Sequence, residues 1–565
     1  MVTNPIIRKE VLMALRTRKA ILMQALYLLV VGALVYLLWP AEGLQDIGGH
    51  QSRRILAVLA VAQVVLVALF APVFTASSLT IERERNTLES LFATPLKPWE
   101  IVLGKMVGAL ASLVLLVLSG TPALASPLML GGLTGGEVLA AMALLLVTAV
   151  FLGAIGLLVS SFMHRSYRAI IVTFVILVVI CFLMAVPAWP VSQSLILQGG
   201  PAWQGVVHVI ASFSPLQAML SLVLGDSPYT PAVQGMPTYW QTYFIIALVG
   251  TAGAAWFCYR RLRRPIAPPR PREALRVVER NEFSGRTVFY MYFFDPNRRK
   301  KPIGPLENPI LMKEFRTRPL LQPRWLMRAI GICLISSILL VFLVAVSVQA
   351  FMTEPASFYA ALTSAVAALM SVLVVLVGPA MTAGAICSDR ESGVWELLRA
   401  TPLSSWTIVS GKFQACVIPL LLLVGSMLPA LAVLLYFESN LWPHVIASAG
   451  VVGITVLLVA TAGMFFSSLA SRTATATAWT YALMIGVGLL SLLALLGREL
   501  FPPRLIEAVF TVNPVAAAMA AAGSQTMQGY EIVRPYVITA AAAIAFMFTC
   551  TVLRVHRLRR TDDRS

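Results

Sequence analysis

Runs of about 20 apolar residues recur along the whole chain, and they limit its fold more than any other feature. A helix of that length crosses the hydrocarbon core of a bilayer. Backbone polar groups find no water there, so only helices or a closed barrel can span it. The runs are continuous rather than alternating, and only 12% of all residues are charged, about half the fraction found in soluble domains. We therefore predict an all-α polytopic membrane protein.

Twelve of these runs are expected to be transmembrane helices. In the first half of the chain they lie at 20–38, 55–80, 101–130, 138–162, 169–186 and 239–259. In the second half they lie at 325–348, 358–386, 406–436, 442–469, 474–496 and 536–553.

The second half of the chain repeats the first. Residues 72–169 align with residues 379–476 at a constant offset of 307, without a gap. Matching landmarks include Glu84/Glu391, Pro95/Pro402, Trp99/Trp406, Gly104/Gly411 and Lys105/Lys412. Unrelated apolar helices share Leu and Val through composition, but they do not share Glu, Pro, Trp and Lys in register. The pattern indicates an internal duplication.

The duplication divides the chain into units. We predict an amphipathic interface helix at 1–19, a first six-span half at 20–264, a Pro- and Arg-rich linker at 265–307, a second interface helix at 308–325, a second six-span half at 326–560, and a tail at 561–565. Because six is an even number, both halves cross the membrane in the same direction. They are expected to be parallel repeats, related by a pseudo-two-fold axis along the membrane normal.

The distribution of Lys and Arg indicates the orientation. With the N-terminus in the cytoplasm, the external residues among the 43 basic ones are Arg53, Arg54, Arg498, Arg504 and Arg534. Basic residues concentrate in cytoplasmic loops, so we expect both termini and the linker in the cytoplasm and the chain in a bacterial inner membrane. The basic linker is expected to lie against anionic lipid headgroups rather than to bind nucleic acid.

A charged segment lies between the second and third spans of each half. We call residues 82–96 and 389–403 the elbows. Apolar residues recur at helical spacing in both copies, and Pro95 or Pro402 ends the helix, so each elbow is predicted to be a short amphipathic cytoplasmic helix. A charge run of this kind can be a solvated loop that stays out of the bilayer. Two copies in register favour a docking surface instead.

The elbows carry a resemblance to a known family. The chain resembles the ABC-2 type permeases, the membrane subunits of ATP-binding cassette exporters. Their pattern has [ST]-x-E-R-E-x-G-T-L-E-x-L-L-x-T-P-L, followed by Gly-Lys, and an Asn-Pro element before the sixth span. Residues that match it are Thr80, Glu82, Arg83, Glu84, Thr87, Leu88, Glu89, Leu91, Thr94, Pro95, Leu96, Gly104, Lys105 and Asn513-Pro514. The departures are Asn86 for Gly, Ser214 for Asn, and Val394-Trp395 for Thr-Leu.

The resemblance implies that each elbow is a coupling helix seated on a separate ATPase subunit. One chain would supply both six-span halves and bind two ATPase subunits, which would hold the ATP and Mg²⁺; the chain itself would bind no cofactor and would not be an enzyme. The residues expected at this contact are Glu82, Arg83, Glu84, Glu89, Asp389, Arg390, Glu391 and Glu396. The four residues Glu84, Glu89, Glu391 and Glu396 are expected to carry coupling, and the two arginines to be local helix or headgroup partners. The departures suggest that the two halves contact the ATPases unequally.

The residues themselves also favour an external source of energy. A Walker A loop needs a leading Gly and a Ser or Thr after its Lys; here Trp99 and Trp406 replace the Gly, and Met106 and Phe413 follow the Lys. The predicted spans hold almost no ionisable residues away from their ends, which argues against an ion-coupled carrier. Two alternatives remain: an ion-driven secondary transporter, and a membrane-embedded scaffold or enzyme. A Ser160–His164 pair would suit the latter, but Ser471 replaces the histidine in the second copy. No metal-ligand spacing occurs.

Overall fold

The computed structural model describes residues 7, 9, 18–39, 50–84, 87, 98–163, 165–181, 184, 201–225, 236–262, 308–317, 331, 334, 355–496, 501 and 503–560. All regular secondary structure in these residues is helical, which confirms the predicted all-α fold class. Eight of the described helices are long and apolar enough to cross a bilayer, and a bent pair would make nine. The predicted span at 325–348 and the linker at 265–307 fall outside the described residues, apart from residues 331 and 334.

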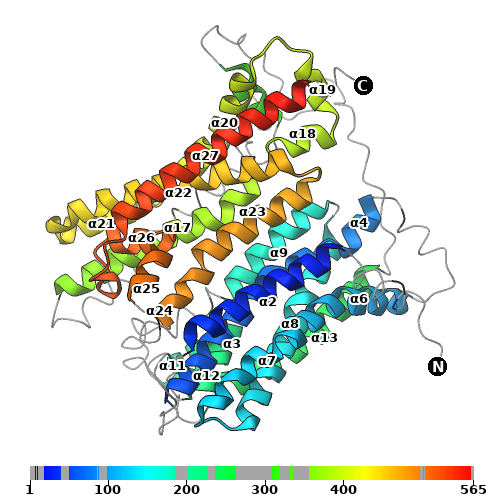
Figure 1. Ribbon diagram of the computed structural model, residues 1–565, viewed down its shortest axis with the longest axis vertical. Coiled ribbons are helices and arrows are strands. Elements are labelled where there is room, and N and C mark those ends of the chain that lie inside the picture. The colour runs from blue at the N-terminus through cyan, green and yellow to red at the C-terminus, as the bar shows by residue number, and fades with distance from the viewer. Residues whose placement is uncertain are drawn as a thin grey trace, which may run out of the picture.

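The long helices of both halves lie side by side (Figure 1). In the first half they are α2 (Arg18–Leu38), α3 (His50–Thr75), α6 (Pro98–Ser119), α8 (Gly135–Phe162), α9 (Ser166–Cys181) and α13 (Tyr239–Leu262). In the second half they are α17 (Pro355–Thr382), α20 (Ser405–Gly425), α22 (Trp442–Leu469), α23 (Thr473–Gly488) and α27 (Val533–Arg560). Of the predicted interface helices, the structure describes α15 (Pro309–Thr317), together with single residues of 1–19.

Several predicted spans are interrupted near their ends. The span predicted at 55–80 ends as α3 at Thr75, and a turn separates it from α4 (Ser78–Glu84). The spans predicted at 101–130 and 406–436 break before α7 (Thr121–Ala125) and α21 (Leu428–Phe437), whose first turns contain Pro122 and Pro429. Proline lacks the N–H that would continue the preceding helix, which explains both breaks. The run at 474–496 breaks after α23 into η5 (Leu490–Leu492) and α24 (Leu493–Leu496).

Short helices occupy the region before the last span of each half. They are α11 (Pro201–Ala211) and α12 (Pro215–Leu224) in the first half, and α25 (Pro503–Phe510) and α26 (Pro514–Ala521), bent by 98°, in the second. Asn513 caps α26, because its Oδ1 accepts hydrogen bonds from Val515 N at 2.7 Å and Ala516 N at 3.1 Å. Ser214 caps α12 in the same manner through Gln217 N. The Asn-Pro element is thus a helix start, and serine serves there as well as asparagine.

The second and fourth spans of each half approach closely at a glycine. A Cβ on Gly156 would overlap the Thr75 hydroxyl, and a Cβ on Gly463 would overlap the Thr382 hydroxyl. Both threonines donate back to the carbonyl one turn earlier in their own helix, at 2.8 and 2.9 Å. Gly156 and Gly463 are related by the offset of 307, as are the two threonines. The repeat is therefore present in the packing as well as in the sequence.

The two halves meet along their fifth spans, α9 and α23. Around them lies an apolar cluster that we call the seam; its buried members are Leu69, Ala76, Val159, Ala169, Ile170, Phe174, Val178, Tyr481, Ile485 and Leu489. In Figure 1, α9 and α23 lie between the first half and the second. The rings of Phe174 and Tyr481 stack here, 4.5 Å apart.

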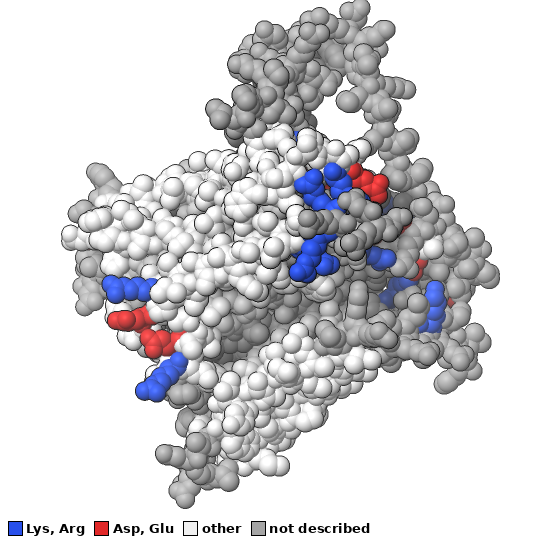
Figure 2. All heavy atoms as spheres, turned by 45° about the horizontal axis from the view of Figure 1, so that its top comes forward, with Lys and Arg blue, Asp and Glu red and all other residues white. Residues whose placement is uncertain are grey.

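Charged residues gather at the two ends of the helices. Figure 2 shows two groups of Lys, Arg, Asp and Glu on this face, separated by a broad zone of uncharged residues. The helices α4, α18 (Cys387–Glu391) and α19 (Val394–Arg399) lie at one end, which we call the elbow end, and α11, α12, α25 and α26 lie toward the other, the loop end (Figure 1). Uncharged helix surface between charged ends is what a bilayer requires.

Candidate functional site at the elbows

A serine of the fourth span holds the start of the helix that leads into each elbow. The Ser160 hydroxyl accepts hydrogen bonds from Leu79 N and Thr80 N, at 3.1 and 3.2 Å. In the second half, the Ser467 hydroxyl accepts from Ile386 N and Cys387 N, both at 2.9 Å. These N–H groups lie at the start of α4 and α18 and would otherwise lack a partner. The structure thus uses Ser160 as a hydrogen-bond acceptor, while its suggested partner His164 lies outside the described residues.

The arginine of each elbow binds the end of the fourth span. Arg83 donates to the carbonyls of Met163 and Ser161, both at 2.7 Å. Arg390 donates to the carbonyl of Ala470 at 3.4 Å. The last carbonyls of a helix have no partner inside it and carry partial negative charge, so a guanidinium there is favourable. The structure therefore places both arginines as local helix partners.

The glutamate that follows each arginine binds the start of the fifth span. Glu84 Oε1 accepts from Ser166 N at 2.7 Å. Glu391 Oε1 accepts from Thr473 N at 2.9 Å, and its Oε2 accepts from the Thr473 hydroxyl at 2.7 Å. A carboxylate at this position satisfies an unpaired N–H and interacts favourably with the helix dipole. Both carboxylates are directed to their own chain.

The acidic residue that opens each elbow pairs with the lysine of the Gly-Lys motif. Lys105 Nζ donates to Glu82 Oε1 at 2.8 Å, and Lys412 Nζ donates to Asp389 Oδ2. Lys105 is 4% exposed and Lys412 is 0% exposed. A buried ammonium needs such a partner, because burial of an unpaired charge is costly. The Gly-Lys motif thus fixes the elbow to the third span.

In the second half, the interface helix α15 also contacts this pair. Lys412 also donates to Glu314 Oε1 at 2.8 Å, and Lys313 of the same helix, α15, lies 3.2 Å from Asp389 Oδ2. We call Lys313, Glu314, Asp389 and Lys412 the ion cluster; its two positive and two negative charges balance. Gly411 permits this arrangement, since a Cβ there would lie 2.6 Å from Asn308 Oδ1 at the start of α15.

Beyond these attachments, the second elbow leaves one face uncovered. It consists of two helices rather than the single one predicted, because Gly393 between α18 and α19 has a positive φ of 74°, which glycine adopts without strain. Trp395 and Leu398 of α19 are buried, whereas Glu396 is exposed and Leu397 is 71% exposed. Arg559 of α27 donates to the carbonyls of Leu403 and Thr401 beside Pro402, and so fixes the turn that follows.

Both halves of the chain match models of a known protein family. Residues 4–265 and residues 344–552 each match a family model described as "ABC-2 family transporter protein". The chain belongs to the ABC-2 family. It carries two permease domains in one chain and is a membrane subunit of an ATP-binding cassette transport system, with ATP-binding cassette ATPases as its partners. No curated protein matches this permease.

Of the remaining predicted site residues of the permease, the structure describes some and not others. Glu89 and Pro95 of the first elbow lie outside the described residues. Gly104 is buried within α6, next to Lys105. Sequence reasoning did not identify Ser160, Ser467, Glu314, Ser166 and Thr473 as partners of the elbows. Ser160 and Ser467 were visible as a matched pair, but nothing local to the sequence indicated what they bind.

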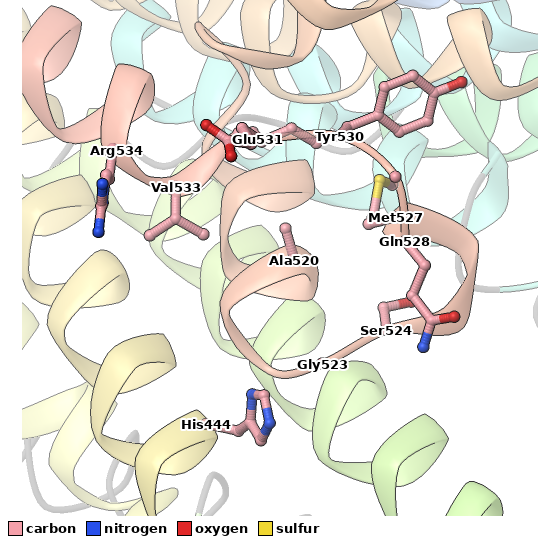
Figure 3. Close-up of a pocket in the computed structure, with 12 residues that line it drawn as sticks. His444, Ala520, Gly523, Ser524, Met527, Gln528, Tyr530, Glu531, Val533 and Arg534 are labelled. Carbon is pink, nitrogen blue, oxygen red and sulfur yellow. The ribbon is translucent and has the colours of Figure 1, made fainter.

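The permease also has a cavity of about 570 Å³ at its loop end (Figure 3). The turn after α26 and the start of α27 line it, and His444 of α22 points toward Gly523. His444 Nδ1 lies 3.2 Å from the Ala521 carbonyl. Its counterpart in the first half is Glu137, which instead caps α8 with Thr134 and forms an ion pair with Arg53 at 3.1 Å. The described hydrogen bonds of the elbows therefore recur in both halves, whereas the two halves differ here at the loop end.

No ligand set for a metal ion is formed by the described part of the permease, in which no three His, Cys, Asp or Glu side chains group together.

Proposed function

We propose that one copy of this permease supplies both halves of an ABC exporter, and that two separate ATPase subunits dock on its two elbows. The observation that carries the proposal is the twin construction of the elbows. Each is fastened to its own third, fourth and fifth spans by residues that correspond at an offset of 307. An element fastened in this way transmits a displacement to the helices rather than absorbing it.

The exposed face of α19 supports docking. Leu397 is an apolar side chain that is 71% exposed at the helix surface, next to the exposed carboxylate of Glu396. An apolar anchor beside a charged group suits a groove on a protein partner. Ser90 occupies the position of Leu397 in the first elbow, so the two ATPase contacts are expected to be unequal.

The basic residues support a cytoplasmic location of the elbow end. Arg260 and Arg261 end α13, and Arg557, Arg559 and Arg560 end α27. Arg261 lies over the ring of Phe162 at the end of the fourth span, and Arg559 donates to Thr401 of the second elbow. Trp99 and Trp406 lie exposed at the starts of α6 and α20, where interfacial aromatic residues are expected. An ATPase in the cytoplasm of a bacterium would reach both elbows from this side.

The setting of the Gly-Lys motif supports placing ATP and Mg²⁺ on the partner. Phosphate-binding lysines follow a glycine-rich loop at the start of a helix. Lys105 and Lys412 instead lie inside α6 and α20, and each is engaged with a carboxylate of its own chain.

The test is the composition and the activity of the complex from native membranes. A tagged copy of the chain should copurify with an ATPase subunit in a one-to-two ratio, and inverted vesicles should gain cargo only with ATP. Leu397→Asp should lower recovery of the ATPase at least about tenfold, because a charge replaces an apolar anchor. Val512→Asp is the matched control, since Val512 is an exposed apolar residue in a turn at the loop end.

Recovery of the chain without an ATPase, or unchanged recovery with Leu397→Asp, would contradict docking at this elbow. Transport that follows a proton gradient and not ATP would favour the ion-driven alternative.

A further inference from the structure

We propose that Glu84 and Glu391 are positioning residues that move the fifth span of each half with its elbow, and that this movement separates the Phe174–Tyr481 ring pair and opens the seam. This inference rests on the proposed function. It concerns how a displacement travels from an elbow to the contact between the halves.

The first step is the connection between elbow and fifth span. In the described residues, Glu82 and Asp389 connect the elbows to the third span of their own half. Arg83 and Arg390, together with the serines Ser160 and Ser467, make the connections to the fourth span. Among the described residues, the elbow hydrogen bonds that reach the fifth span come from Glu84, to Ser166 N, and from Glu391, to Thr473 N and Oγ1. The carboxylate is thus the polar connection from each elbow to the helix that forms the seam.

The second step is the position of the rings on those helices. Ser166 begins α9 and Phe174 lies eight residues later; Thr473 begins α23 and Tyr481 lies eight residues later. Eight residues of helix span about 12 Å. A rigid helix of that length, held at its first turn, carries its ring along when the first turn moves. The arrangement is the same in both halves, so both rings respond to their own elbow.

The third step is the nature of the seam. The hydroxyls of Thr173, Thr477 and Thr480 each donate to a carbonyl four residues earlier in their own helix, at 2.7 to 2.8 Å. The ring contact itself consists of stacked carbon faces, with an interplanar angle of 16°. Dispersion contacts of this kind separate without leaving a buried hydrogen-bonding group unpaired. The Tyr481 hydroxyl donates to Leu376 of α17 in its own half at 2.8 Å, so that bond is compatible with separation of the halves.

The experiment measures the distance between the two fifth spans in the assembled complex. Spin labels at Arg168→Cys and Thr475→Cys, which correspond at the offset of 307 in the first turns of α9 and α23, would be introduced after the native cysteines are replaced. In the otherwise unchanged complex, trapping the ATPases with ATP and vanadate should shift the distance by several ångströms. With Glu84→Ala and Glu391→Ala together, the shift should disappear, and transport per ATP hydrolysed should fall at least tenfold.

Glu84→Gln with Glu391→Gln keeps an acceptor for both backbone N–H groups and should restore most of the shift. Glu137→Ala is the matched control, because Glu137 caps a span through the same kind of bond at the loop end; it should leave both the shift and the transport-to-ATPase ratio unchanged. If the double alanine variant does not assemble, Thr473→Val removes one bond of the second connection and should reduce the shift in part.

An unchanged shift of the spin-label distance in the double alanine variant, or complete loss of that shift in Glu137→Ala, would overturn this inference while leaving docking intact. Failure of the unchanged chain to bind an ATPase at all would instead overturn the proposed function.

Discussion

Phe174 and Tyr481 stack face to face between the two halves, with ring centroids 4.5 Å apart and planes inclined by 16°. The two residues correspond at the offset of 307 that relates the repeats, so the pseudo-two-fold axis passes between their rings. A residue near such an axis meets its own counterpart. Both positions carry an aromatic ring, and the hydroxyl of Tyr481 donates to the Leu376 carbonyl at 2.8 Å.

The ring pair should contribute to stability as a unit. Phe174→Ala and Tyr481→Ala should each destabilise the protein, and the double variant should lose about 0.5–1.5 kcal/mol less than the sum of the two, because the stacking can be lost only once. Thermal unfolding in detergent would measure the stability of the two single variants and the double variant in this double-mutant cycle. Tyr481→Phe keeps the stack and should cost about 0.5–1.5 kcal/mol for its hydrogen bond. Strictly additive alanine effects would contradict a direct contact.

The two Gly-Lys lysines should differ in their importance. Lys412→Met removes the central cation from buried Glu314 and from Asp389, whose side chain is 14% exposed. Removal of one partner from a buried ion pair typically costs about 3–5 kcal/mol. Lys105→Met should cost less, since the side chain of its partner Glu82 is 21% exposed and water can solvate part of the carboxylate. Unfolding temperatures of the two variants, measured side by side, test the order. Adding Glu314→Gln and Asp389→Asn to Lys412→Met should recover part of the loss, and equal losses for the two lysines would rule out the buried cluster as the cause.

The packing of α15 against α20 should depend on the absence of a side chain at Gly411. Gly411→Ala places a Cβ 2.6 Å from Asn308 Oδ1, so α15 must shift, and the ion cluster loosens with it. We expect a clear drop in unfolding temperature, largely restored by adding Asn308→Ala. Gly450→Ala is the control in α22, where a Cβ meets nothing within 4 Å; it should gain up to about 1 kcal/mol from helix propensity. An unchanged unfolding temperature in Gly411→Ala would mean that α15 does not pack against Gly411.

Acid should destabilise the protein through His208. This residue of α11 is 2% exposed and stacks on Tyr239 at 4.3 Å. Burial lowers the pKa of His208, and a hydrogen bond to the Pro237 carbonyl only partly offsets this effect. The folded state therefore holds the neutral ring, while the unfolded chain takes up a proton below about pH 6.5. Stability should be intact above that pH and fall by up to about 1.4 kcal/mol per pH unit below it.

His208→Phe preserves the stacking and removes the titration, so its unfolding temperature should vary less between pH 7 and pH 5 than that of the unchanged protein. Identical pH profiles for the unchanged protein and His208→Phe would exclude His208 as the source.

The amino-acid sequence alone determined the helical class, the positions of most spans and the duplication. These follow from local composition, because a long apolar run in lipid has no alternative to helix, and from charged and aromatic landmarks that repeat in register. The elbows could be predicted because their charged and aromatic residues repeat in register in the two halves. Pro122 and Pro429 mark the helix breaks in the sequence, but the apolar residues on both sides of each proline led to the prediction of one continuous span.

Only the tertiary structure decided what those landmarks contact. The sequence marked Glu84 and Glu391 as a matched pair and suggested an external partner, whereas their carboxylates bind Ser166 and Thr473 within the chain. It did not single out Phe174 and Tyr481, which lie five residues beyond the aligned block. Spans that are apolar on every side carry no signal of which face meets another helix. That choice depends on shape and on distant partners, so it is made only when the two halves pack together.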